Sequence, residues 1–510
     1  MKKLANLCQI VTLRSPLSLP LLDVRDWGDT KEMQLVQSLL SRPDATQHQL
    51  VRELYGQHTP AHLEAFWQLR ARLQAKLLNH LYFLDHTDAR YPVERRYDMA
   101  LWQMLHQAGV LQSEGEYLMA EQRLRRALLL AEQDDFIHHA VQAARLLRNL
   151  YANQRQPAKY QQAVRHYAAL SQRLVGEEEA EALHMEVRSA ISGTISMRRA
   201  FLPRLADIIR RLGELQAQAP SFNIYTYLYR ARLIQEEMLG HYPEMLRITQ
   251  QAADELATGQ LNPRRFDVRF NHYYTVYAYL RSRRVEQGLQ LAEQYEAAFH
   301  KSSNNWFSFQ ENHTLLAIHA GSYPRARAII KAALTNPFFH RQRLAARERW
   351  QLYEAYVDFL LPAPKAARTA TVAQWAMQLP DFNRDKRGYN VSILILQLLY
   401  FLRRRNLDEV MTRLERLRKY RQLHLRDEHT VRSRLFLRLL ALLSDKDFNP
   451  RACAERGQNL LAKLSDTPQP GEAFAQIEVV PYEELWAITL RLLRQGAPLA
   501  AKVTKKGDKA

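Results

Sequence analysis

A pattern that recurs about every 40 residues constrains this chain more than any other feature of its sequence. In its clearest copies, Tyr117 and Tyr323 are followed three positions later by Ala120 and Ala326, and further apolar residues follow at helical spacing. Each such anchor residue predicts a helix with one buried face. The looser copies are anchored at Tyr160, Phe201, Tyr242, Val285, a degenerate unit near Lys365, Leu407 and Phe448. Repetition at this spacing predicts a stack of helical pairs, each packed on its neighbours.

The small residue after each anchor has a physical reason. Alanine or glycine at Ala120, Ala163, Gly288 and Ala326 allows two helices to cross closely, because a larger side chain would hold the backbones apart. The composition also favours helices. Only 16 glycines and 20 prolines occur in 510 residues, which disfavours turn-rich β architectures, and strong helix formers such as alanine and leucine dominate. The chain is therefore predicted to be all-α.

The pattern Gly-x-Tyr-x-x-Ala, followed by a large residue and then Ala-Leu, resembles the second helix of tetratricopeptide repeats. The resemblance covers residues 95–465, and it implies a curved, right-handed α-solenoid whose first helices line the concave surface. Two departures stand out. The spacing of 38 to 43 residues exceeds the family's period of about 34, and Met245 and Val410 occupy the small-residue position. The alternative is a helical bundle without a true repeat.

Composition and local pattern divide the chain into five parts. Residues 31–92 predict a small helical domain, with helices over 31–41, 46–55 and 60–84, and residues 93–465 hold the repeat array. A proline-rich break follows at residues 466–471. The remaining parts are an extended segment over residues 1–30, a capping segment over residues 466–496 and a basic disordered tail over residues 497–510.

Several function classes are disfavoured. The two cysteines, Cys8 and Cys453, are too few for a disulfide framework or a cysteine-based zinc site. No phosphate-binding Gly-Lys-Ser/Thr loop, Gly-x-Gly-x-x-Gly, His-Glu-x-x-His or Gly-x-Ser-x-Gly occurs. The longest apolar run, residues 391–402, is too short to span a bilayer and predicts a buried helix. The acidic run at residues 177–179 is interpreted as capping the start of a helix. We therefore expect a cytoplasmic protein that is not an enzyme, requires no cofactor or metal and does not enter a membrane.

Aromatic residues gather on the expected first helices of the central units. Six lie between Phe266 and Tyr279, and side chains this closely spaced cannot all face one side of a helix. Some are expected in the core between units and others in a groove, where tyrosine and tryptophan commonly anchor partner peptides. The candidate partner-binding residues, which include two asparagines that can bond a peptide backbone, are Tyr225, Tyr229, Phe270, Asn271, Tyr273, Tyr274, Tyr277, Trp306, Phe309 and Asn312.

The net charge of +19 is unevenly distributed, and residues 401–440 hold twelve basic against five acidic side chains. This basic patch contains Arg403, Arg404, Arg405, Arg413, Arg416 and Arg421. Such a patch either binds polyanions through phosphate contacts or is the solvated face of two helices, and the second interpretation is favoured because no aromatic residues are interleaved for base stacking. The three short helices expected over residues 31–85 would also suit a DNA-binding helix-turn-helix domain. Residues 31–90 are nearly neutral, however, with seven basic and six acidic residues, which disfavours this interpretation.

Together these patterns predict a non-enzymatic scaffold or adaptor that holds a peptide or protein segment in the groove of a helical array. The alternative is a nucleic-acid-associated regulator that uses the basic patch or the N-terminal helices. The identity of the partner and the oligomeric state stay open.

Overall fold

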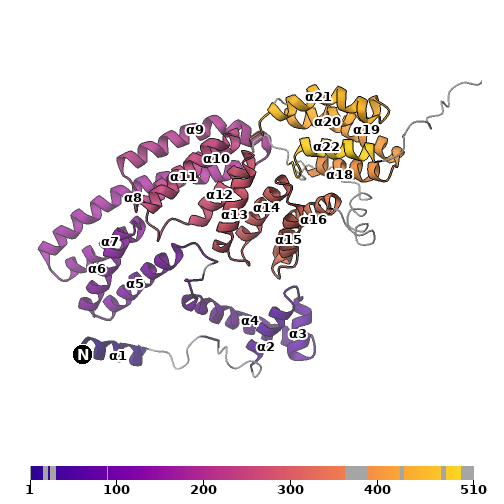
Figure 1. The fold of residues 1–510 in the computed structure, drawn as a ribbon. Helices are drawn as coiled ribbons and strands as arrows, with labels where there is room; N and C mark the ends of the chain where they lie inside the picture. The colour runs from indigo at the N-terminus through magenta and orange to yellow at the C-terminus, as the bar shows by residue number, and fades with distance from the viewer. Residues whose placement is uncertain are drawn as a thin grey trace, which may run out of the picture.

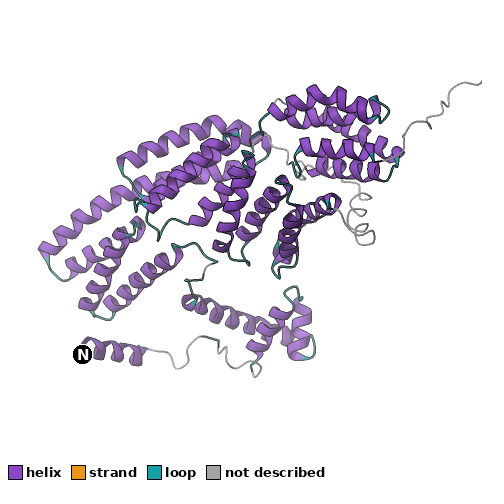
Figure 2. Ribbon diagram, viewed as in Figure 1, coloured by secondary structure: helices purple, strands orange, loops and turns teal. Residues whose placement is uncertain are grey.

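The computed structural model describes residues 2–14, 21–22, 30–88, 90–361, 389–425, 430–471 and 478–495. These residues form 21 α-helices, three short 3-10 helices and no strand (Figure 2). The prediction of an all-α chain is confirmed for this part of the protein. The degenerate unit near Lys365 and the tail over residues 497–510 lie outside the described residues.

The N-terminal helices α2 to α4 form a small group with its own core. Each begins after a threonine whose hydroxyl accepts a backbone N–H, as Thr46 does from Gln49 at 3.4 Å. The core contains Met33, Val51 and Phe66, and Figure 1 shows the group beside the longer array. The helices predicted here are confirmed, with bounds α2 Lys31–Ser41, α3 Gln47–Tyr55 and α4 Pro60–His80, followed by a 3-10 turn at Leu81–Phe83.

The first helix corrects the prediction that residues 1–30 are extended. Helix α1 spans Lys2–Arg14, because no proline occurs before Pro16 and lysine, leucine, alanine and glutamine favour the helix. The Asn6 side-chain amide donates a hydrogen bond to Glu116 Oε1 at 2.6 Å. Arg14 pairs with Glu114 at 3.3 Å. Helix α1 therefore lies against the turn that precedes α6.

The twelve helices from α5 to α16 pack in sequence, each against its neighbour, as helical pairs do in a repeat array (Figure 1). Their bounds are α5 Arg95–Ser113, α6 Tyr117–Gln133, α7 Ile137–Asn153, α8 Pro157–Ile191, α9 Ile195–Gln218, α10 Phe222–Leu239, α11 Tyr242–Ala257, α12 Val268–Arg281, α13 Val285–Tyr295, α14 Asn304–His319, α15 Tyr323–Leu334 and α16 Leu344–Leu360. Two 3-10 turns lie at Glu296–Ala298 and Phe339–Arg341. Consecutive packing supports a helical repeat fold.

Five of the anchor residues are the first residue of a helix, and each follows the same turn. Helices begin at Tyr117, Tyr242, Val285, Tyr323 and Leu407. The residue two positions earlier has positive φ in all five cases: Gly115, Gly240, Arg283, Gly321 and Arg405. A left-handed residue ends the preceding helix and reverses the chain, so the glycine of the sequence pattern marks the turn itself.

The small residue of each unit is buried where helices cross. Ala120, Ala163 and Ala326 are all buried, and a Cβ added to Gly288 would lie 2.8 Å from Tyr279 Cβ and 2.9 Å from Leu316 Cδ2. The reason given for a small side chain at this position is confirmed at Gly288 by these distances.

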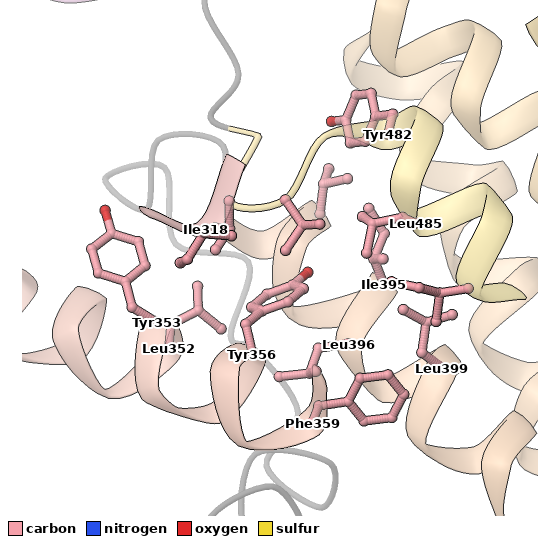
Figure 3. Close-up of a cluster of buried hydrophobic side chains, with 14 of the residues drawn as sticks. Ile318, Leu352, Tyr353, Tyr356, Phe359, Ile395, Leu396, Leu399, Tyr482 and Leu485 are labelled. Carbon is pink, nitrogen blue, oxygen red and sulfur yellow. The ribbon is translucent and has the colours of Figure 1, made fainter. Parts of the chain in front are cut away.

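The C-terminal helices continue the core of the array. Helices α18 Tyr389–Arg403, α19 Leu407–His424, α20 Val431–Asp445, α21 Pro450–Asp466 and α22 Tyr482–Arg494 follow α16. Figure 3 shows side chains of α14, α16, α18 and α22, including Ile318, Tyr356 and Leu485, in one buried cluster. All residues from 391 to 402 are buried, which confirms the buried helix predicted there.

The segment that was predicted to cap the stack also folds back onto earlier helices. Helix α22 packs on α18 and α20 as well as on α21. The Pro470 carbonyl accepts hydrogen bonds from Tyr242 Oη at 2.7 Å and from Arg281 at 2.8 Å. Tyr323 donates a hydrogen bond to Glu484. Pro470 and Glu484 therefore connect the C-terminal part of the chain to α11, α12 and α15.

Candidate partner-binding site

Three hollows adjoin one another along the middle of the array. The central hollow, of about 510 Å³, lies between α10, α12, the start of α14 and residues 92–94. A second, of about 320 Å³, shares Pro92, Phe266 and Arg269 with it. A third, of about 450 Å³, shares Glu94 and Arg265 with it and reaches α5 and α7. Because neighbouring hollows share lining residues, they lie side by side, and we call the three together the central groove.

Capping residues fix the starts of α10 and α12, the two helices that supply most of the residues lining the central hollow. Helix α10 begins after Ser221, whose hydroxyl accepts the Ile224 backbone N–H at 3.2 Å. Helix α12 begins after Asp267, whose carboxylate accepts the Arg269 N–H at 3.1 Å. Successive turns of each helix then direct aromatic rings into the hollow. From α10 these are Phe222, Tyr227 and Tyr229, and from α12 they are Phe270, Tyr273 and Tyr274.

Four of the ten candidate partner-binding residues line the central hollow: Tyr229, Phe270, Tyr273 and Tyr274. Of these, Tyr229 is buried and donates a hydrogen bond to Asn271 Oδ1 at 2.7 Å. That bond engages Asn271, so both side chains hold α10 against α12.

The other candidates lie elsewhere. Tyr225 donates a hydrogen bond to Glu255 on α11 at 2.7 Å. Tyr277 packs edge-on against Tyr242, with ring centroids 6.2 Å apart. Trp306, Phe309 and Asn312 are buried on α14, with exposed fractions of 3%, 0% and 7%. A bound segment would have to displace core side chains to reach them, because the rotation of α14 turns these residues inward.

An exposed tryptophan in the groove was missed by the sequence interpretation. Trp102 on α5 is 42% exposed and lines the third hollow. Its ring lies 4.7 Å from that of His139 and 5.7 Å from that of His138. Half-exposed aromatic residues in a hollow are typical anchors for protein partners. No repeat pattern marks Trp102, since its importance depends on the hollow beside α7.

The groove is held in shape by Arg265, a buried arginine that the sequence interpretation also missed. Its guanidinium donates to the carbonyl oxygens of Asp134 at 3.1 Å and Asp135 at 2.6 Å, and to Asn223 Oδ1 at 2.7 Å. It also lies 3.9 Å from the centroid of the Phe136 ring. Asn223 in turn donates to the buried carboxylate of Glu177 at 3.0 Å. This arginine therefore fixes the turn before α7 against the start of α10.

Burial sets the protonation of the group of side chains beside the central hollow. It raises the pKa of the Tyr227, Tyr229 and Tyr274 hydroxyls, which are neutral at pH 7 even at the ordinary tyrosine pKa. Burial, together with the nearby charges of Arg230 and Arg188, lowers the pKa of His184 to about 4. The His184 ring stacks on Tyr227, with centroids 4.6 Å apart. At neutral pH the arginines therefore supply the positive charge here.

The structure divides the basic patch into engaged and solvent-facing arginines. Arg413 is buried, pairs with Glu409 and donates to Gln397 at 3.2 Å. Arg403 and Arg405 donate to the carbonyl oxygens of Phe359 at 2.7 Å and Leu492 at 2.9 Å. Arg404 lies over the Tyr400 ring.

Three other arginines of this region line a hollow between α19 and α20. Arg421, Arg434 and Arg438 line it, with a volume of about 500 Å³. Arg416 is half-buried on α19 and does not line the hollow. In the part of the chain that the structure describes, none of these four arginines forms an ion pair with a described acidic residue.

The N-terminal helices lose much of their available positive charge to one another. Lys76 pairs with Glu32 at 2.6 Å, and Arg72 lies 3.7 Å from the same carboxylate. Arg70 lies over the ring of Trp67. These contacts leave little unpaired charge for a DNA backbone on this face of α4.

Comparison with known proteins identifies no relative: no protein-family model, curated protein or solved structure matches this chain significantly. Among the described helices, none has both the length and the apolar character needed to cross a bilayer. The described residues also contain no group of three His, Cys, Asp or Glu side chains placed to hold a metal ion.

Proposed function

We propose that this protein is a non-enzymatic scaffold that holds a segment of a partner protein in the central groove. The observation that carries the proposal is the adjacency of the three hollows, which extend from Trp102 on α5 to Asn305 on α14. An extended peptide needs a long concave surface with aromatic anchors. We further propose that the array is a divergent tetratricopeptide-like solenoid whose concave side contains this groove.

The decisive test compares two tryptophans of nearly equal exposure. Trp102 is 42% exposed inside the groove, and Trp67 is 46% exposed on α4, outside it. We expect Trp102→Ala to weaken partner binding by about 10-fold or more, as loss of an aromatic anchor does, and Trp67→Ala to leave it unchanged. Partners are captured by crosslinking in cells that express the chain, with nuclease added, and the affinity of each captured protein is then measured with the purified variants.

A second pair of variants tests the central hollow. Tyr273 lines it, whereas Tyr277 lies one helical turn further along α12 and does not. Both side chains are half-buried, so the two alanine variants should lose similar amounts of stability. Partner binding should fall only for Tyr273→Ala. Equal binding by all four variants, each still folded at the temperature of the assay, would reject the groove as the partner site.

A second candidate function is binding of a nucleic acid at the hollow between α19 and α20. The observation that favours it is the convergence of Arg421, Arg434 and Arg438 without a described acidic partner. Phosphate contacts make affinity fall steeply with salt. Labelled single- and double-stranded DNA and RNA are titrated from about 50 to about 200 mM salt. Reversal of the three charges to glutamate should abolish binding and its salt dependence, while Arg210→Glu on α9 should not. Salt-independent binding, or binding that survives the reversal, rejects this function.

A further inference from the structure

Three arginines line the central hollow, and two of them are neutralised by neighbouring groups. Arg269 forms two hydrogen bonds with the Asp267 carboxylate, at 2.8 and 2.7 Å, and donates to the Tyr91 carbonyl at 2.7 Å. Arg265 is held by Glu94, at 3.3 Å, and by two main-chain carbonyls. The positive charges of Arg265 and Arg269 are therefore compensated by carboxylates of the protein itself.

The third arginine, Arg230 on α10, has no such compensation. Its guanidinium lies 4.9 Å from the centroid of the Phe270 ring, within the range of a cation–π contact. Within the described ranges its Nε is buried and has no hydrogen-bond partner, and the guanidinium forms no ion pair. A buried charged donor without an acceptor is costly. An anion in the hollow would supply a counter-charge for this guanidinium.

A second unsatisfied polar atom lies on the same face of α10. Thr226 precedes Arg230 by one helical turn, and its hydroxyl is also buried without a hydrogen-bond partner among the described residues. Both side chains line the hollow. The rest of the wall includes the aromatic residues Phe270, Tyr273 and Phe299. It also includes Glu94 and Asp267, whose carboxylates are paired with Arg265 and Arg269. Arg230 and Thr226 thus lie beside aromatic rings that can hold a planar apolar body.

We propose that the central hollow is a binding site for a small aromatic carboxylate, whose carboxylate pairs with Arg230 and Thr226 and whose ring lies among the aromatic side chains. A volume of about 510 Å³ lies within the range of small-molecule sites. The planar guanidinium offers two parallel N–H groups to a carboxylate. Because the tyrosine hydroxyls of the wall are neutral at pH 7, they do not repel the anion.

The test uses matched pairs of ligands that differ only in charge. The first pair is 2-naphthoate and 2-naphthamide, followed by other aromatic and aliphatic acids with their amides. Thermal melting of the full-length protein identifies binding, and calorimetric titration gives each dissociation constant. We expect the wild-type protein to prefer aromatic acids over their amides by about 10- to 100-fold, the range of a charge-assisted pair.

Three variants show whether Arg230 causes the preference. Arg230→Gln should bring the acid and the amide to nearly equal affinity, and Arg230→Lys should keep part of the preference, since a point charge replaces the guanidinium fork. Arg232→Gln, an exposed arginine on the same helix, is the matched control and should behave as wild type. If Arg230→Gln melts far below wild type, Arg230→Lys and the wild-type pairs decide the question.

The outcomes separate clearly. An acid preference in wild type that is lost in Arg230→Gln, or reduced in Arg230→Lys, supports the site. Equal affinity of acids and amides in wild type, an acid preference that persists in Arg230→Gln, or no binding by any member of the panel overturns it. None of these results changes the capture of partners by Trp102, so failure here is distinct from failure of the proposed function.

Discussion

Two glycine-to-alanine substitutions should change stability in opposite directions. Gly288 lies on α13 where it crosses α12 and α14, and Gly213 lies on α9. An alanine Cβ at position 288 would be 2.8 Å from Tyr279 Cβ and 2.9 Å from Leu316 Cδ2. At position 213, no heavy atom lies within 4 Å of the added Cβ. The same methyl group therefore meets a crowded helix crossing in one case and open space in the other.

The magnitudes follow from two competing terms. Alanine in place of glycine stabilises a helix by about 0.5–1 kcal/mol, and overpacking a core costs about 1–3 kcal/mol. Tyr279 Cβ is attached directly to the backbone of α12, so relief at position 288 requires a shift of the helix itself. We therefore expect Gly288→Ala to lower the free energy of unfolding by about 1–2 kcal/mol. Gly213→Ala should raise it by about 0.5–1 kcal/mol.

Hydrogen exchange measured by mass spectrometry is the suitable assay, because a long array need not unfold in a single two-state step. Exchange in α13 and α14 should accelerate by about 10-fold for Gly288→Ala, since 1.4 kcal/mol corresponds to a factor of ten in an equilibrium constant. Exchange in α9 and α10 should slow for Gly213→Ala. A second open position, Gly109 on α5, provides a replicate of the stabilising case. If Gly288→Ala stabilised its helices as Gly213→Ala does, the close crossing at Gly288 would be refuted.

Three further substitutions test other parts of the structure. Arg432→Met removes the buried partner of Glu478, which lies 2.6 Å away, so the C-terminal helices should lose about 3–5 kcal/mol in urea unfolding, and the double variant with Glu478→Gln should recover part of it. Trp306→Ala should cost about 3–5 kcal/mol by the same measurement, because this side chain is in the core and not in the groove. His184 has a folded pKa of about 4 against an ordinary value of 6.5, so its contribution to stability is complete above pH 6.5 and is lost as the pH falls through 4. His184→Gln should flatten the dependence of the urea midpoint on pH over this window, and an unchanged slope would contradict the assignment.

Helix starts were predictable because their causes are local. The left-handed turn and the anchor lie within a few residues of each other, as Gly321 and Tyr323 do. The long helix α8 was not predictable in the same way. Residues 177–179 are near the middle of Pro157–Ile191 and not at a helix start, and Glu177 is buried. The repeat pattern predicts that a helix ends near this point, but Gly176 lies inside α8 and does not interrupt it.

The groove was predictable only in part, because an aromatic cluster does not reveal which rings meet solvent. Tyr273 and Trp306 have similar sequence surroundings, yet one lines the hollow and the other is 3% exposed. That difference arises from the rotation of α12 and α14 about their axes, which is set by packing against other helices. Periodicity does not indicate the buried face of these two helices, because apolar and aromatic residues occur on several sides of each.

The three arginines of the central hollow show the same limit for charge. Sequence neighbours do not distinguish Arg265 from Arg230, because the groups that hold Arg265 belong to residues 94 and 134–135, more than 100 positions away. Arg269 is neutralised by Asp267, two residues before it. Among the described residues Arg230 has neither kind of partner, and it lines a hollow whose nearby hydroxyls are neutral. The net charge of +19 shows only that the chain is basic. Where positive charge is available to a ligand depends on which individual arginines are paired with acidic groups.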